Sequence, residues 1–255
     1  MAAALDELYP PSLAASWDAI GLVCGDPSST VRRVLLAVDP VDVVVQEALD
    51  LDCQLLLTHH PLFLRPTTSV AADTPKGRVV HRLITAGCGL FVAHTNADAA
   101  RPGVNDALAA LLELQDPQAL PGGLGLVGDL PGALSVQALT ERVAQVLPAT
   151  AWGVRASGDP QTVVRRIAVC GGAGDDLLVV AAQAGAQAFL TADLRHHRAS
   201  EAPEGLVLVD AAHWATEWPW LPDAAARLAS VVDVETVVST TCTDPWTTAQ
   251  RSPHP

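Results

Sequence analysis

Short apolar runs alternate with helical patterns along the first third of the chain. Runs at residues 34–38 (VLLAV), 53–58 (CQLLLT) and 90–93 (LFVA) predict buried strands. Between them, residues 41–49 and 77–86 carry apolar side chains at helical spacing. No tight-turn sequence joins neighbouring strands. The order strand, helix, strand, helix, strand therefore predicts a parallel α/β sheet.

The last third of the chain repeats this rhythm. Residues 166–170, 188–191 and 206–209 are the expected strands, and residues 136–147 and 177–184 are the expected helices. A second α/β lobe is therefore predicted.

Glycine and proline crowd residues 115–133, and we interpret this segment as the boundary between the two lobes. The predicted fold class is α/β, with two lobes of mostly parallel sheet sandwiched by helices and no transmembrane segment. The expected domains are residues 1–122 and residues 123–255. Residues 171–174 (GGAG) are interpreted as a tight strand-to-helix turn, since a phosphate-binding loop would also need a lysine.

The composition supports a folded and acidic protein. Hydrophobic residues make up 49% of the chain and charged residues 17%, which is enough to build a core. The formal net charge of −13 argues against nucleic acid as the main partner, because such binding depends on neutralising phosphates. An acidic chain binds metal cations readily, and a bound metal would supply the positive centre that an anionic substrate needs.

The cysteines and the N-terminus predict a cytoplasmic protein. The five cysteines are scattered and none forms a CxxC pair, as expected for reduced and mostly buried thiols. No apolar run reaches the roughly 18 residues of a membrane span. The N-terminus carries Asp6 and Glu7 without a basic start, so it does not have the pattern of a signal peptide.

Residues that can bind a metal follow several of the predicted strands. Six of the eight histidines lie in such segments. Because the carboxyl ends of parallel strands share one edge of a sheet, side chains placed there form sites. Imidazole and carboxylate groups are ligands for Zn, Fe, Mn, Co or Ni. The sequence therefore predicts a metal site, with candidate residues His59, His60, His94, Asp98, Asp193, His196, His197, His213 and Glu217.

The adjacent pair His59-His60 favours two metal ions over one. Pro61 pushes the residue before it toward an extended conformation, and neighbouring side chains in an extended chain diverge. Each histidine is then placed to hold its own ion, with a carboxylate bridging the two. Either Glu217 or Asp98 could be this bridge.

The segment around Glu217 gives a less direct prediction. His213 and Glu217 are four residues apart, which would place them on one face of a helix. Because Pro219 follows closely, we expect instead that Thr216 caps a helix opened by Glu217, with His213 in the preceding loop. His196 and His197 either open a helix or orient metal ligands.

Six motifs in order carry a resemblance to a known family. The chain resembles the dinuclear metal centre hexameric proteins, the GTP cyclohydrolase I type 2 homologues, in a short form that lacks the inserted domain of longer members. The match covers nearly the full length. Its motifs are SWDAIGL (16–22), THHP (58–61), HTNAD (94–98), TADLRHH (191–197), DAAHWATE (210–217) and TDPW (243–246).

The resemblance implies a homo-hexameric ring with a site for two divalent metal ions in each chain. It implies that His213 and Glu217 return to a metal site shared with the first lobe, with Glu217 as the bridge. His94 and His197 would lie close by as candidate catalytic residues. This chain departs from the family pattern at three positions, where it has Ala19, Ala192 and Ala212. The implied metal ligands are His59, His60, Asp98, His213 and Glu217.

Two functions are open at this point. The first is a metal-dependent hydrolase of the GTP cyclohydrolase kind, acting on a purine nucleotide, with His94 or His197 moving the proton. The second is a non-catalytic metal-handling, storage or regulatory scaffold protein. A membrane partner is not expected, and nucleic acid is disfavoured by the charge.

Overall fold

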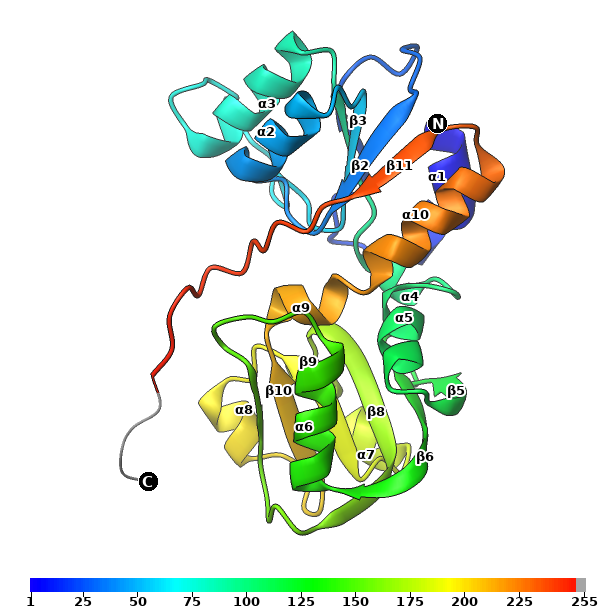
Figure 1. Ribbon diagram of the computed structural model, residues 1–255, viewed down its shortest axis with the longest axis vertical. Coiled ribbons are helices and arrows are strands. Elements are labelled where there is room, and N and C mark those ends of the chain that lie inside the picture. The colour runs from blue at the N-terminus through cyan, green and yellow to red at the C-terminus, as the bar shows by residue number, and fades with distance from the viewer. Residues whose placement is uncertain (251–255) are drawn as a thin grey trace. The chain divides into compact units, whose positions relative to one another are not determined.

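The computed structural model describes residues 1–250, and their contacts divide the chain into two compact units (Figure 1). Unit 1 contains residues Met1–Gly103 and Trp220–Thr243. Unit 2 contains Val104–Pro219 and the described part of the tail from Asp244. This division differs from the expected boundary at residue 122, because unit 2 already begins at Val104 and the chain returns to unit 1 after Pro219.

Unit 1 is built on a five-stranded sheet in the order β1-β4-β3-β2-β11. The last four strands in this order are parallel, and β1 lies antiparallel at one edge. All residues of β3 and β4 are buried, which explains their continuous apolar sequence. The three predicted strands and their parallel pairing are confirmed. The strands are β1 (Gly21–Cys24), β2 (Arg33–Ala37), β3 (Leu55–Thr58), β4 (Gly89–Val92) and β11 (Glu235–Val238).

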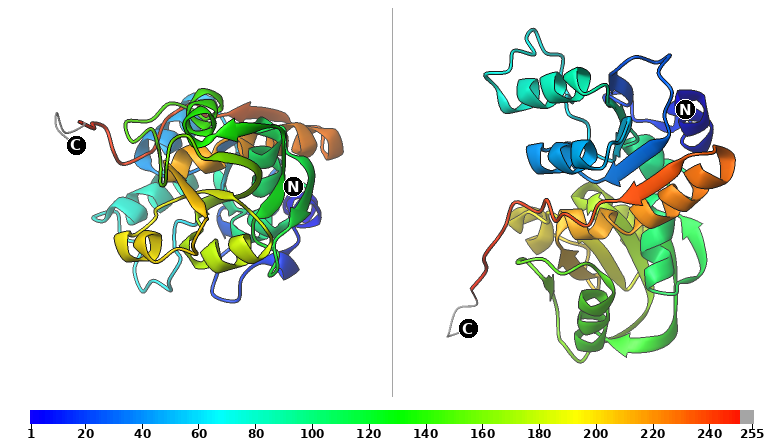
Figure 2. Two further views of the ribbon diagram at one scale, coloured as in Figure 1. Left: turned by 90° about the horizontal axis from the view of Figure 1, so that it is seen from below. Right: turned by 45° about the horizontal axis from the view of Figure 1, so that its top comes forward.

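Helices cover both faces of this sheet (Figure 1). The predicted helices α2 (Asp42–Asp50) and α3 (Pro75–Thr85) are confirmed, and Figure 2 shows them side by side on one face. Helices α1 (Ala2–Leu8) and α10 (Trp220–Val231) lie on the other face. The side chain of Thr74 caps α3 by accepting from the backbone N–H of Gly77. The 3-10 turn η1 (Pro11–Leu13) and the short helix α4 (Thr95–Ala99) complete the unit.

Unit 2 is built on a six-stranded mixed sheet in the order β5-β6-β8-β9-β10-β7. Its centre, β8-β9-β10, is parallel, and the other pairings are antiparallel. The centre contains the three strands that the sequence predicted. The strands are β5 (Gln115–Ala119), β6 (Leu126–Ser135), β7 (Val154–Ala156), β8 (Val163–Ala173), β9 (Ala188–Ala192) and β10 (Val207–Ala211).

The helices of unit 2 include the two that were predicted. The side chain of Ser135 caps α6 by accepting from the backbone N–H of Ala138. Leu178 of α7 packs with Phe189 and Leu208 of the sheet in one apolar cluster. The helical elements are α5 (Val104–Leu111), α6 (Val136–Val146), η2 (Asp175–Leu177), α7 (Leu178–Gln183), α8 (His196–Ser200) and α9 (His213–Glu217).

The interpretation of residues 115–133 as a boundary is wrong. These residues form the antiparallel strands β5 and β6 of the unit 2 sheet. Gly122 and Gly123, both with positive φ, make the turn between the two strands. Leu126 and Val127 are buried, so the glycines mark a turn within unit 2 and not a linker.

Two local expectations are also corrected. Residues 171–173 are the end of strand β8 and not a turn, and the pairing of β8 with β9 shifts register between Val169 and Ala173. His213 begins helix α9 instead of lying in a loop. The helix ends at Glu217, before Pro219, so the proline is accommodated without breaking it.

Within residues 1–250 we find no helix with both the length and the apolar character needed to cross a membrane.

Candidate metal centre

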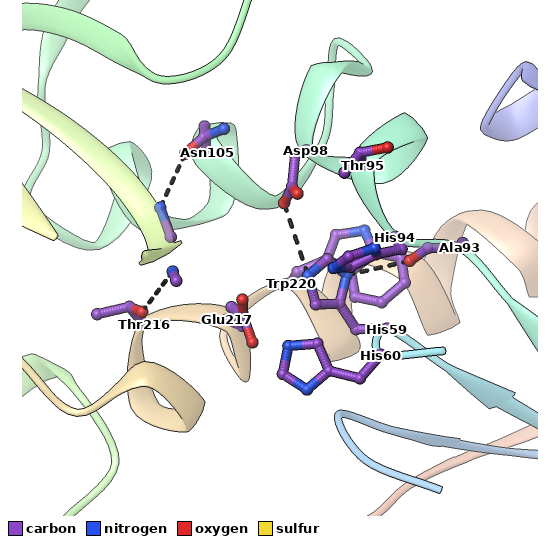
Figure 3. Close-up of polar contacts among 12 residues, drawn as sticks. His59, His60, Ala93, His94, Thr95, Asp98, Asn105, Thr216, Glu217 and Trp220 are labelled. Atoms are coloured by element: carbon purple, nitrogen blue, oxygen red, sulfur yellow. Dashed lines mark hydrogen bonds and ion pairs between the residues drawn. The ribbon is translucent and has the colours of Figure 1, made fainter. Parts of the chain in front are cut away.

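Three histidines of unit 1 converge at the carboxyl edge of its sheet (Figure 3). His59 and His60 follow β3 directly, and His94 follows the neighbouring parallel strand β4. One ring nitrogen from each lies within 4.8 Å of those of the other two. We call these three residues the histidine cluster. Asp98, on α4, places its Oδ1 3.6 Å from Nε2 of His59.

The rings of His59 and His60 are held through their Nδ1 atoms. Nδ1 of His59 donates to the backbone oxygen of Ala93 at 3.0 Å, and Nδ1 of His60 donates to Oδ1 of Asp39 at 2.7 Å. A carbonyl oxygen can only accept, so the proton of neutral His59 sits on Nδ1 and leaves a lone pair on Nε2. Metal-binding histidines are fixed in this way by a second hydrogen bond.

His94 is held in the same manner by a carboxylate. Its Nδ1 donates to Oδ1 of Asp18 at 2.9 Å. Burial and the neighbouring His59 lower the pKa of His94, and the attraction of Asp18 does not reverse this. Burial alone would raise the pKa of Asp18, but hydrogen bonds from Thr95 and His94 outweigh it, and the net shift is downward. The pair is therefore a neutral imidazole beside an ionised carboxylate.

Packing fixes His59 further. Its side chain is fully buried, and its ring meets the indole of Trp220 edge to face at 5.5 Å. Trp220 is itself buried and donates from Nε1 to the hydroxyl of Tyr9 at 3.1 Å. A ring enclosed in this way has little rotational freedom, so its Nε2 keeps a defined direction.

Unit 2 contains a second pair of candidate ligands on α9. Nε2 of His213 lies 2.9 Å from Oε1 of Glu217, and Nδ1 lies 2.7 Å from Oδ2 of Asp193. Burial disfavours the charged ring, but the carboxylates of Glu217 and Asp193 outweigh burial and raise the pKa of His213 to about 11. Without a metal, His213 is therefore an imidazolium that donates to both carboxylates.

The glycine-rich end of β8 makes room for this pair. The backbone N–H of Gly171 donates to Oδ1 of Asn105 at 3.0 Å, and that of Gly172 donates to Oγ1 of Thr216 at 2.9 Å (Figure 3). Gly172 has a φ of +64°, and a Cβ built there would lie 2.4 Å from Oε1 of Glu217. Only glycine lets the strand approach the carboxylate so closely.

The remaining candidates lie elsewhere in unit 2. His196 and His197 are exposed on α8, with their rings 5.3 Å apart. They open that helix, one of the two roles expected for them. Neither belongs to a metal-capable cluster within the part of the chain that the structure describes. The catalytic role predicted for His197 stays a prediction.

The donor set fits divalent transition metals. Imidazoles whose Nδ1 atoms are held by hydrogen bonds, with carboxylates nearby, are ligands that zinc and its neighbours accept. Sequence reasoning missed the supporting carboxylates Asp18 and Asp39. Asp39 stands just after a predicted strand, and this position was the available signal. Asp18 lies in the SWDAIGL motif (16–22), but its burial depends on tertiary structure, so the motif alone does not show its role.

The charge state of His213 gives a pH prediction for the metal-free protein. Its folded pKa, about 11, is above its ordinary value of 6.5, so its contribution to stability is complete below pH 6.5 and is lost as the pH rises through 11. Glu217→Gln removes the stronger charge partner and should lower this pKa. We expect ring NMR to show His213 protonated at pH 8 in the wild type, and deprotonation at lower pH in the variant.

Chemical unfolding of the same two proteins gives a second measure. The stability difference between wild type and Glu217→Gln should be largest near pH 6 and should shrink toward pH 10. A difference that is constant with pH would contradict this charge assignment.

The fold and the candidate ligands define a two-unit α/β protein with histidine and carboxylate groups at the carboxyl edges of its two sheets. The chain belongs to the Duf34/NIF3 (NGG1p interacting factor 3) family, whose model matches residues 1–245. A Bacillus cereus protein related to NIF3 shares the fold, with a TM-score of 0.90, 24% identity and coverage of 97% of both chains. The predicted α/β fold class is thereby confirmed.

Relatives with assigned names agree with the predicted family. A Streptomyces coelicolor protein named GTP cyclohydrolase 1 type 2 homolog is 54% identical over 260 residues, covering 96% of this chain and 91% of that protein. A Mycobacterium bovis protein of the same name is 36% identical over 361 residues, covering 95% and 94%. The second alignment is longer than this 255-residue chain, so that relative carries additional sequence, as expected if this chain is a short form.

Proposed function

We propose that this chain holds two divalent metal ions and, loaded with them, hydrolyses the purine ring of a nucleotide such as GTP. One observation carries the metal part. Each of the four histidines at the two sheet edges has its Nδ1 bonded to a backbone oxygen or a carboxylate, the second hydrogen bond by which metal-binding histidines are oriented. The four are His59, His60, His94 and His213.

The separate anchoring of His59 and His60 supports two ions. Their Nδ1 atoms are bonded to different elements, one to Ala93 after β4 and the other to Asp39 after β2. Because each ring is held by a different element, each keeps its own direction, and we assign each histidine to its own ion.

The family motifs that this chain matches support His213 and Glu217 as further ligands, and from these motifs we assign Glu217 as the proposed bridge. The complete proposed set is His59, His60, Asp98, His213 and Glu217.

The names of the relatives support the choice of substrate. A divalent ion in such a centre supplies a Lewis acid and a nucleophile at neutral pH. Water added at C8 of a purine opens the ring at the C8–N9 bond, and a second water cleaves the C8–N7 bond and releases C8 as formate. His94, as a neutral imidazole beside the metal ligands, is the residue we assign to accept a proton. The phosphates of the nucleotide would meet the positive charge of the ions, which this acidic chain otherwise lacks.

Formate release tests this function. Protein loaded in turn with Zn, Mn, Fe, Co and Ni is incubated with GTP, and formate is measured against metal-free protein. We expect formate in amounts exceeding the enzyme only with a metal-loaded sample. A loaded protein that binds two ions but releases no formate would contradict the hydrolase and favour metal handling or storage. The predicted homo-hexameric ring and cytoplasmic location stay predictions.

A further inference from the structure

Trp17 and Asp18 are neighbours in the SWDAIGL motif, but their side chains lie in opposite environments. In the structure the tryptophan is 60% exposed, whereas the aspartate side chain has no exposed surface. A buried carboxylate is costly unless other groups satisfy it, so its partners identify what it does.

Both oxygens of Asp18 accept hydrogen bonds. Oδ1 accepts from Nδ1 of His94 at 2.9 Å and from the backbone N–H of Ala19 at 2.7 Å. Oδ2 accepts from the backbone N–H of Thr95 at 3.0 Å and from its Oγ1. Three of these four donors belong to the segment after β4, far from Asp18 in the sequence. The carboxylate is therefore built into the start of α4, beside the histidine cluster.

The consequence for His94 is a fixed tautomer and a fixed ring direction. With Nδ1–H aimed at Asp18, the unprotonated nitrogen of the neutral ring is Nε2. The ring lies 5.1 Å from that of His59 and 5.7 Å from that of His60, measured between centroids. We propose that Asp18 is a positioning residue that holds His94 with the lone pair of Nε2 presented to His59 and His60.

This role deepens the proposed function, on which it rests for its catalytic part. A base accepts a proton only through an unprotonated nitrogen aimed at the reacting group. Without Asp18 the ring of His94 can rotate or take the other tautomer, and either change removes the acceptor. The Asp18 side chain is fully buried and both its oxygens accept from protein donors, so it acts through His94.

Ring ¹⁵N NMR on metal-free protein tests the positioning directly. We expect wild-type His94 to carry its proton on Nδ1, and Asp18→Ala to give a mixture or the Nε2–H form. Asp18→Asn keeps an oxygen that can accept from Nδ1, so it should restore the wild-type tautomer. An Asp18→Ala protein with the wild-type tautomer would overturn the proposal, whether or not the chain is a hydrolase.

Thr95→Val separates positioning from simple loosening of the segment. This variant removes the bond from Thr95 Oγ1 to Asp18, and the bond to Oγ1 from the backbone N–H of Ala15, but leaves the His94 contact. We expect it to lose stability and to keep the tautomer. If Thr95→Val shifts the tautomer as much as Asp18→Ala, the role of Asp18 is only structural and the proposal fails.

Kinetics give a further readout if the metal-loaded protein releases formate. We expect Asp18→Ala to lower kcat about 10-fold to 100-fold, the usual effect of losing a residue that orients a functional histidine, with KM changed little. Asp18→Asn should recover most of the loss. A kcat that falls equally in Asp18→Ala and Thr95→Val would contradict a positioning role.

Discussion

Replacing Gly172 with alanine is expected to empty the candidate metal centre while leaving the fold intact. The added Cβ would lie 2.4 Å from Oε1 of Glu217 and 3.0 Å from Nε2 of His213. Glu217 Oε1 is the end of a flexible side chain, so it can swing away at little cost to stability. The substitution therefore affects metal binding more than stability, because the Glu217 carboxylate leaves the position from which it would bridge the ions. We expect metal affinity to fall 10-fold to 100-fold or more, measured by competition with a chelator.

Gly205→Ala is the matched control. Gly205 also has a positive φ, +82°, but a Cβ there would meet no atom within 4 Å. Both alanine variants carry the same backbone strain, about 1–2 kcal/mol, which chemical unfolding measures. Only Gly172→Ala should lose metal. If both variants bind metal like the wild type, Glu217 is not a ligand in the position shown.

His59→Ala is expected to have the second large effect. The change removes a proposed ligand and the hydrogen bond to the backbone oxygen of Ala93. That buried oxygen loses its donor and the ring leaves a space beside Trp220, so we expect a loss of about 1–3 kcal/mol in stability. The variant should fold, and elemental analysis should find at least one metal ion fewer per chain than in the wild type.

His81→Ala provides the control for this variant. His81 lies exposed on α3, outside the histidine cluster. It should keep the metal content and stability of the wild type. A His59→Ala protein with full metal content would mean that His59 is a structural residue, held by Ala93 and Trp220 for packing alone.

The unit 1 sheet could be predicted because its signal is local. The apolar runs that became β2, β3 and β4 are buried on both sides, so each stands out without knowledge of its neighbours. The polar residues after β3 and β4 then had to share one edge of a parallel sheet. The meeting of His59, His60 and His94 followed from that topology alone.

The predictions that were wrong concern features that depend on contacts which local sequence does not show. Residues 115–119 and 126–135 have a composition typical of a linker, but they pair at the edge of the unit 2 sheet. Pro219 argued against a helix through His213, yet one helical turn fits before it. The buried Asp18 is satisfied by a segment 76–77 residues away, and no local pattern announces such a contact.

The role of Gly172 differs from the one predicted. The composition of the GGAG stretch predicts a turn, whereas the structure shows the end of a strand packed against Glu217. Glycine permits both, and only the position of the neighbouring side chain distinguishes them. The substrate is likewise not predicted by local sequence, because the side chains that recognise a nucleotide can come from segments with no common pattern.

Elemental analysis of the purified wild-type protein tests the central claim most directly. The protein is expressed with Zn, Mn, Fe, Co and Ni available, dialysed against buffer without chelator, and analysed for metal per chain. We predict close to two divalent ions per chain, removed by chelator without unfolding and regained on adding metal. A correctly folded protein that holds no metal, and takes up none when metal is supplied, would contradict the account.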